Sequence, residues 1–188
     1  MTEIKNSEQL DTWKNNLKEA ADRLTFHKNL SGLELLAKAK FEQCGFNPEK
    51  PEEQLNFIEQ VNQTFTYMVT YRAVEWLWKN GYENQEFSLN LGPQSGYDIE
   101  NNNIVAEVFA AVSPSNNGKL KSDIGKVVGK ETEEEKKSKS KYVFYTSPEP
   151  HKSNFKELNG GQVCNDTKDV TIVYFPLGEL IEEYKNKA

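Results

Sequence analysis

The sequence predicts an α/β fold in which helices cover both faces of a mixed β-sheet. Three observations support this. The hydrophobic period changes from 3.6 residues to 2 near residue 82, separating a helical first part from a part rich in strands. The order then expected is a meander of three strands followed by helix, strand, helix, strand and helix, which is typical of an α/β sandwich. The 188 residues suit one domain with a sizeable core.

The beginning of the chain is expected to form a helical extension. Apolar residues recur at spacings of three and four between residues 8 and 43, with a break near residues 29–32. This pattern predicts an amphipathic layer that packs on the core or on a partner. We therefore expect residues 1–48 to be an N-terminal helical extension and residues 51–188 to be the main α/β domain.

A longer helix is predicted over residues 51–80, because Pro51 is tolerated in a first turn and two acids follow it. Arg72 falls inside the apolar stripe of this helix. A buried guanidinium cannot lose its charge, so it must pair with an anion, either a site carboxylate or a substrate phosphate. The alternative is an arginine that reaches solvent from a partly exposed edge.

Shorter elements are expected after residue 82. The predicted strands are residues 87–91, 97–100, 104–112, 142–146 and 170–175, and the predicted helices are residues 119–130, 151–158 and 177–187. The strand at 104–112 is almost continuously apolar, which is typical of a strand buried on both faces.

Composition restricts the classes of function. The sequence has no apolar run long enough to span a membrane and no signal-peptide pattern at its start, so a cytoplasmic location and no membrane partner are expected. Two distant cysteines and two histidines exclude a cysteine- or histidine-rich metal site. The net charge of −6 argues against general nucleic-acid binding, but residues 119–141 hold eight lysines and five acids, a local excess of three positive charges.

One acid interrupts the apolar strand at 104–112. This residue, Glu107, follows Asp98 by nine positions, and a tight turn between their strands lets both carboxylates converge at one end of the sheet. Two close carboxylates repel unless a divalent cation lies between them, and hard oxygen ligands suit Mg²⁺. The alternative is that Glu107 lies on an exposed edge and Asp98 merely in a turn.

The segments 95–99 (SGYDI) and 104–109 (IVAEVF) resemble the core of the PD-(D/E)xK nuclease superfamily, which includes type II restriction endonucleases and archaeal-type Holliday junction resolvases. The resemblance covers about residues 55–185 and extends to the order of the elements. It implies a restriction-endonuclease-like three-layer α/β/α core. It also implies that Asp98, Glu107 and the backbone carbonyl of Val108 hold Mg²⁺ for the hydrolysis of DNA.

The chain departs from the family motif at one position. The motif lysine belongs two residues after the glutamate, where this chain has Phe109, and the nearby Ala111 is no substitute. In the family this lysine orients or activates the attacking water and stabilises negative charge, and some members supply it from the next helix. On residues 119–130 the best candidate is Lys126, which is mid-helix, and then Lys119.

Further cations are expected to bind the substrate, namely Arg72, Lys121 and Lys130. Lys119, Lys126 and Lys130 share one stripe of the predicted helix with Asp123, and the alternative for this stripe is an ordinary solvated face.

Two functions follow from these residues. The first is a Mg²⁺-dependent endonuclease, a hydrolase acting on DNA such as a restriction endonuclease. The second is a non-catalytic DNA-binding or protein-interaction module on a degenerate form of the same fold. Phe109 favours the module, whereas two acids in a buried hairpin favour the nuclease. The partners expected are DNA and, for assembly, a second copy of the chain.

Overall fold

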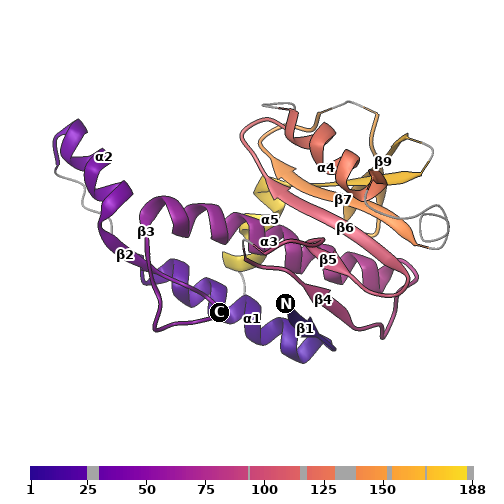
Figure 1. The fold of residues 1–188 in the computed structure, drawn as a ribbon, viewed down its shortest axis with the longest axis horizontal. Coiled ribbons are helices and arrows are strands. Elements are labelled where there is room, and N and C mark those ends of the chain that lie inside the picture. Colours follow the sequence, from indigo (N-terminus) through magenta and orange to yellow (C-terminus); the bar gives the residue numbers. More distant parts are fainter. Residues whose placement is uncertain are drawn as a thin grey trace.

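The computed structural model describes residues 1–24, 30–92, 94–114, 118–129, 139–151, 154–167 and 169–185. Within these ranges an eight-stranded mixed sheet runs in the order β1-β4-β5-β6-β7-β10-β9-β8 (Figure 1). Its strands are β1 (Thr2–Ile4), β4 (Phe87–Leu89), β5 (Ile99–Glu100), β6 (Ile104–Ala110), β7 (Ser140–Ser147), β8 (Lys156–Leu158), β9 (Gly161–Thr167) and β10 (Val170–Pro176).

The helices that accompany this sheet are α1 (Ser7–Asp22), α2 (Gly32–Phe41), α3 (Phe57–Lys79), α4 (Lys119–Gly129) and α5 (Leu177–Lys185). A separate two-stranded sheet pairs β2 (Gln43–Phe46) with β3 (Gln54–Asn56). Among the described helices, none has the length and apolar character needed to cross a membrane.

The sheet is parallel at its centre and antiparallel at both sides. Strands β6, β7 and β10 pair in parallel, and β5 and β9 flank them in antiparallel pairings. Successive side chains of β6 point to opposite faces. Ala106 and Val108 pack in the core shared with α3, whereas Val105 and Phe109 pack in the core shared with α4. The expected α/β class with a mixed sheet and helices on both faces is confirmed, and Glu107 belongs to the face covered by α4.

The long helix begins later than the sequence predicts. α3 begins at Phe57, and residues 54–56 form strand β3 instead. Asn56 provides the reason, because its side chain accepts a hydrogen bond from the backbone N–H of Glu59 while the Glu59 carboxylate accepts one from Asn56. This reciprocal cap fixes the first turn more firmly than Pro51 does.

The prediction of a helix over residues 151–158 is wrong. Its last three residues form β8, which pairs antiparallel with β9 at the edge of the sheet. Asn159 and Gly160 join the two strands, and both have positive φ, 49° and 80°. An Asn-Gly pair in this conformation is the preferred two-residue hairpin turn. These two residues are therefore the feature of the sequence that predicts a hairpin here.

The beginning of the chain packs on the core of the main domain, which is one of the two placements expected for it. β1 forms an outer strand of the main sheet by pairing with β4, and Ile4, Leu10 and Leu17 lie in the same hydrophobic core as α3. The predicted helical region over residues 8–43 contains α1 and α2, and its end begins strand β2. In Figure 1, α2 projects away from the main sheet, whereas α1 lies beside α3.

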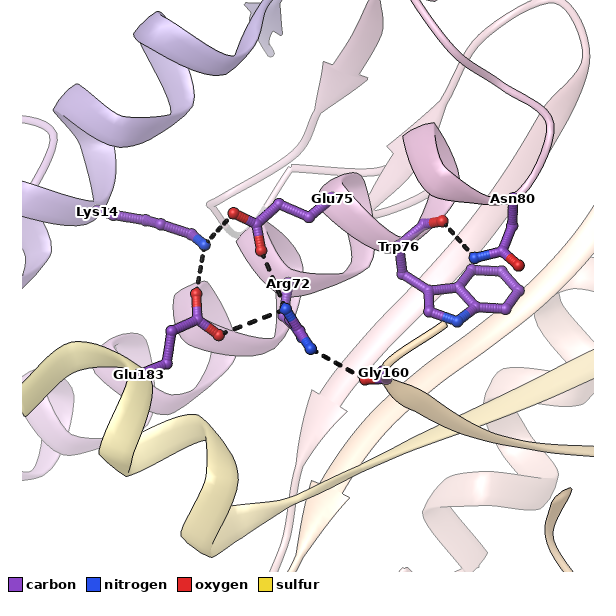
Figure 2. A network of polar contacts seen from close by, with 7 residues as sticks. All are labelled: Lys14, Arg72, Glu75, Trp76, Asn80, Gly160 and Glu183. Carbon is purple, nitrogen blue, oxygen red and sulfur yellow. Dashed lines mark hydrogen bonds and ion pairs between the residues drawn. The ribbon is translucent and has the colours of Figure 1, made fainter. Parts of the chain in front are cut away.

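A closed ring of charges joins three helices on the α3 side of the sheet (Figure 2). Lys14 of α1 is 1% exposed, and its Nζ lies 2.5 Å from Glu75 Oε1 and 2.5 Å from Glu183 Oε1. Arg72 Nη1 lies 3.3 Å from Glu75 Oε2 and 3.7 Å from Glu183 Oε2. Arg72 Nη2 also donates to the carbonyl of Gly160 at 3.1 Å, which ties the ring to the β8–β9 turn.

We predict that Lys14→Met lowers the free energy of unfolding by about 2–4 kcal/mol, because two carboxylates would then share one cation in a largely buried position. Lys18→Met is the matched control on the same helix. It removes an exposed pair with Asp22, and we expect a change of less than about 0.5 kcal/mol. Urea denaturation measures both variants, and equal losses would contradict a stabilising role for the ring.

Candidate functional site

Asp98 accepts two backbone hydrogen bonds, one from the residue after β4 and one from β6. Its carbonyl accepts from Asn90 N at 3.0 Å, and its carboxylate Oδ2 accepts from Val108 N at 2.7 Å. Burial raises the pKa of Asp98 to about 6, the Val108 N–H opposes this shift, and the charge of Glu107 adds to it. Asp98 comes directly before β5, and its carboxylate meets β6 at the residue after Glu107, so the two acids approach each other as expected.

Glu107 is 1% exposed in the middle of β6. Lys126 of α4 reaches it, with Nζ 2.6 Å from Glu107 Oε2. Burial lowers the pKa of Lys126, but the hydrogen bond to Glu107 and the nearby carboxylate charges outweigh this, so the pKa is raised overall. The second oxygen of Glu107, Oε1, is buried and makes no hydrogen bond in the described part of the chain.

Asp123 completes the cluster from the same helix. It is fully buried, and its carboxylate lies 2.8 Å from Lys119 Nζ and 3.2 Å from Lys126 Nζ. The three ionised carboxylates and two ammonium groups then sum to −1. Asp123 is not among the site residues expected from the sequence, although its spacing from Lys119 and Lys126 brings all three side chains together on one face of a helix.

The cluster borders a cavity of about 580 Å³ at the end of β6. Asp98, Val108, Lys119 and Lys126 line it, and Glu107 and Asp123 are not among its lining residues. The remaining lining residues are mostly apolar: Val61, Asn62, Phe65, Thr66, Phe109, Ala110, Ala111, Val112, Thr146, Ser147, Pro148 and Leu177.

Phe109 occupies the position of the missing motif lysine, and it packs in the core. It is 3% exposed, and its ring stacks on Tyr145 with centroids 5.3 Å apart and planes at 12°. Lys119 Nζ lies 5.7 Å from the centre of the same ring. The side chain at position 109 therefore contributes to core packing, and the cations beside the acids come from α4.

The structure does not bring the other expected substrate-binding residues to this cavity. Arg72 does meet anions, but they are Glu75 and Glu183 of the ring on the other side of the sheet. Lys121 is exposed on α4 and does not line the cavity. Lys130 lies outside the described residues.

The acids offer oxygen ligands for a metal ion. Among the described residues there is no cluster of three or more His, Cys, Asp or Glu side chains suited to a metal. Asp98 and Glu107 with the Val108 carbonyl would make a smaller set, and such a set suits Mg²⁺, which keeps several of its waters. The unpartnered Glu107 Oε1 fits this use, because it is a buried anionic oxygen that lacks a donor.

We predict that Asp98 makes stability depend on pH. Its pKa rises from an ordinary 3.8 to about 6 on folding, so its contribution to stability is full below about pH 4 and is lost as pH rises through 6. Asp98→Asn cannot ionise, and its amide oxygen can still accept from Val108. Relative to this variant, the wild type should lose about 2–3 kcal/mol of unfolding free energy between pH 4 and 7.5.

Urea denaturation at both pH values measures this difference. Glu157→Gln, which removes an exposed carboxyl on β8, controls for the loss of one charge. A difference between wild type and Asp98→Asn that stays constant across this range would rule out the raised pKa.

The chain was compared with protein-family models, curated proteins and solved structures, and none of the three comparisons gave a match. The interpretation of this cavity therefore depends on the placement and chemistry of its own residues.

Proposed function

We propose that the protein is a Mg²⁺-dependent endonuclease that hydrolyses phosphodiester bonds in DNA. The observation that carries the proposal is the placement of Lys126, a cation from the following helix, 2.6 Å from a buried strand glutamate beside a second, half-buried acid. Lys126 and Asp98 line a cavity that is open to a ligand, and Glu107 lies behind them. Two acids with an adjacent lysine are group types that suit metal-assisted phosphodiester hydrolysis.

Asp98, Glu107 and the Val108 carbonyl would hold the Mg²⁺. Bound Mg²⁺ would lower the pKa of an attacking water and stabilise negative charge on the phosphate. Asp98 is oriented for this role by the Val108 N–H, which occupies Oδ2. Glu107 is oriented by Lys126, which occupies Oε2 and leaves Oε1 without a hydrogen bond.

Lys126 and Lys119 would take the role of the motif lysine. Both line the cavity, and the Lys126 side chain is 39% exposed, so its ammonium can contact a ligand while it remains paired with Glu107. A fixed cation at this place stabilises charge that develops on a phosphate, and it needs little rearrangement during the reaction. Asp123 holds both lysines and is a positioning residue.

Charge balance makes binding of a phosphate depend on the metal. The cluster carries −1 when its three acids are ionised, and a divalent cation would change this to +1. A phosphate is repelled by the first state and attracted by the second. The protein's net charge of −6 strengthens this dependence, because the rest of the surface supplies little attraction for DNA.

The alternative is a non-catalytic binding module on the same scaffold, and one observation favours it. Phe109 fills the position of the motif lysine with core packing, and the chain thereby loses the usual cation at that place. Incubation of the protein with plasmid DNA and Mg²⁺ or Mn²⁺ separates the two functions. Metal-dependent cleavage supports the nuclease, and intact DNA supports the module.

We predict that Asp98→Asn and Glu107→Gln each abolish divalent-ion binding, because each removes an anionic ligand. Calorimetric titration with Mn²⁺ measures the binding, and Glu157→Gln serves as a control that should bind like the wild type. Equal binding by the wild type and both site variants would refute the metal site.

We predict that Lys126→Ala lowers the cleavage rate about 10²- to 10³-fold, the usual scale for the loss of one charge-stabilising group. Metal binding should survive, because Lys126 is not a ligand. Lys126→Arg keeps a cation and should retain part of the activity. Lys156→Ala, an exposed change on β8, should leave the rate within about twofold. Cleavage by Lys126→Ala at the wild-type rate would contradict the assignment.

A further inference from the structure

The cavity is larger and more apolar than a phosphate and a metal ion require. We propose that it receives one unstacked nucleobase beside the cleaved phosphate. The preferred substrate is then DNA with an unpaired base and not an intact duplex. This inference depends on the proposed nuclease function and names its class of substrate.

The size and walls of the cavity suit a flat, mostly apolar group. Its volume of about 580 Å³ lies in the range of pockets that enclose small ligands. Val61 and Phe65 of α3 form one side, and Leu177 at the start of α5 contributes another apolar surface. Ala110 and Ala111 at the end of β6 have small side chains, which leaves room between these walls.

Phe65 and Asn62 supply the two contacts by which proteins hold a base outside a duplex. An aromatic ring stacks on the face of the base, and an amide offers both a donor and an acceptor to its edge. Both residues line the cavity from α3, together with Thr66, which lies one turn beyond Asn62. They therefore share one face of the helix.

The other hydroxyls of the cavity are already engaged. Thr146 donates to the carbonyl of Phe175 at 2.8 Å, and Ser147 donates to the carbonyl of Glu149. Asn62 and Thr66 are thus the side chains best suited to read the edge of a base.

The charges of the protein favour binding of DNA through a base over binding through its phosphates. The sequence has only two arginines and a net charge of −6, and the lysines that line the cavity are paired with Asp123 and Glu107. Affinity for an intact duplex comes mainly from neutralised phosphates, so it would be weak here. Stacking of one base on an aromatic ring typically changes affinity by about 10- to 100-fold. A paired base can enter the cavity only after it is unpaired and unstacked, and this cost is smallest for a base that is already unpaired.

The test compares three fluorescent DNA duplexes in the presence of Ca²⁺. The first has one bulged thymidine, the second has an abasic residue in the same bulge, and the third is fully paired. Fluorescence anisotropy should show that the bulged thymidine binds at least about tenfold more tightly than either of the others. Equal affinity for the thymidine and abasic bulges would overturn the inference, because these two differ only in the base.

Variants of α3 assign the effect to the cavity. Phe65→Leu keeps an apolar side chain and removes the ring, and it should abolish most of the preference for the thymidine bulge. Asn62→Ala should reduce this preference. Ile58→Ala changes a partly exposed residue of the same helix outside the cavity and should leave it unchanged. A preference that persists in Phe65→Leu, folded as judged by its thermal transition, would overturn the assignment.

Cleavage assays with Mg²⁺ separate failure of this inference from failure of the proposed function. Cleavage of the paired and bulged duplexes at equal rates would keep the nuclease and overturn the base pocket. A base-dependent preference in binding without any metal-dependent cleavage would support the pocket and overturn the nuclease.

Discussion

The placement of α4 depends on one constraint, the burial of Glu107 in a strand that is covered on both faces. A carboxylate in such a position costs several kcal/mol unless a cation and hydrogen bonds compensate it. Lys126 supplies that cation at 2.6 Å, and Asp123 holds Lys126 and Lys119 in turn. The ion pair between Glu107 of β6 and Lys126 of α4 therefore fixes how the polar face of α4 lies on the strand.

The two charge clusters differ in how completely their acids are paired. In the ring of Lys14, Arg72, Glu75 and Glu183, all four carboxylate oxygens contact a cation, so the ring is a closed structural element that joins three helices. In the α4 cluster, Glu107 Oε1 makes no hydrogen bond among the described residues, and burial raises the pKa of Asp98. A buried glutamate with one unpaired oxygen, next to groups that line a cavity, is the feature that favours a functional site over a purely structural one.

Strong local patterns in the sequence predicted the centre of the fold. Strands β6, β7 and β10 have long apolar runs, and the spacing of Asp98 and Glu107 on a hairpin predicted their convergence. The rest depended on signals outside those patterns. β1 is only three residues long and exists through its pairing with β4. The β8–β9 hairpin depended on the Asn-Gly turn at 159–160. An ionic partner of Arg72 was foreseeable, but Glu183 comes from the last helix, so only the tertiary fold reveals it.

The most direct test of the proposed site is anomalous diffraction from crystals grown with Mn²⁺. The proposal predicts one anomalous peak between Asp98 and Glu107, about 2.0–2.3 Å from an oxygen of each carboxylate, with Lys126 still bound to Glu107 Oε2. Crystals without a peak at these two acids would contradict the metal site and with it the proposed hydrolysis.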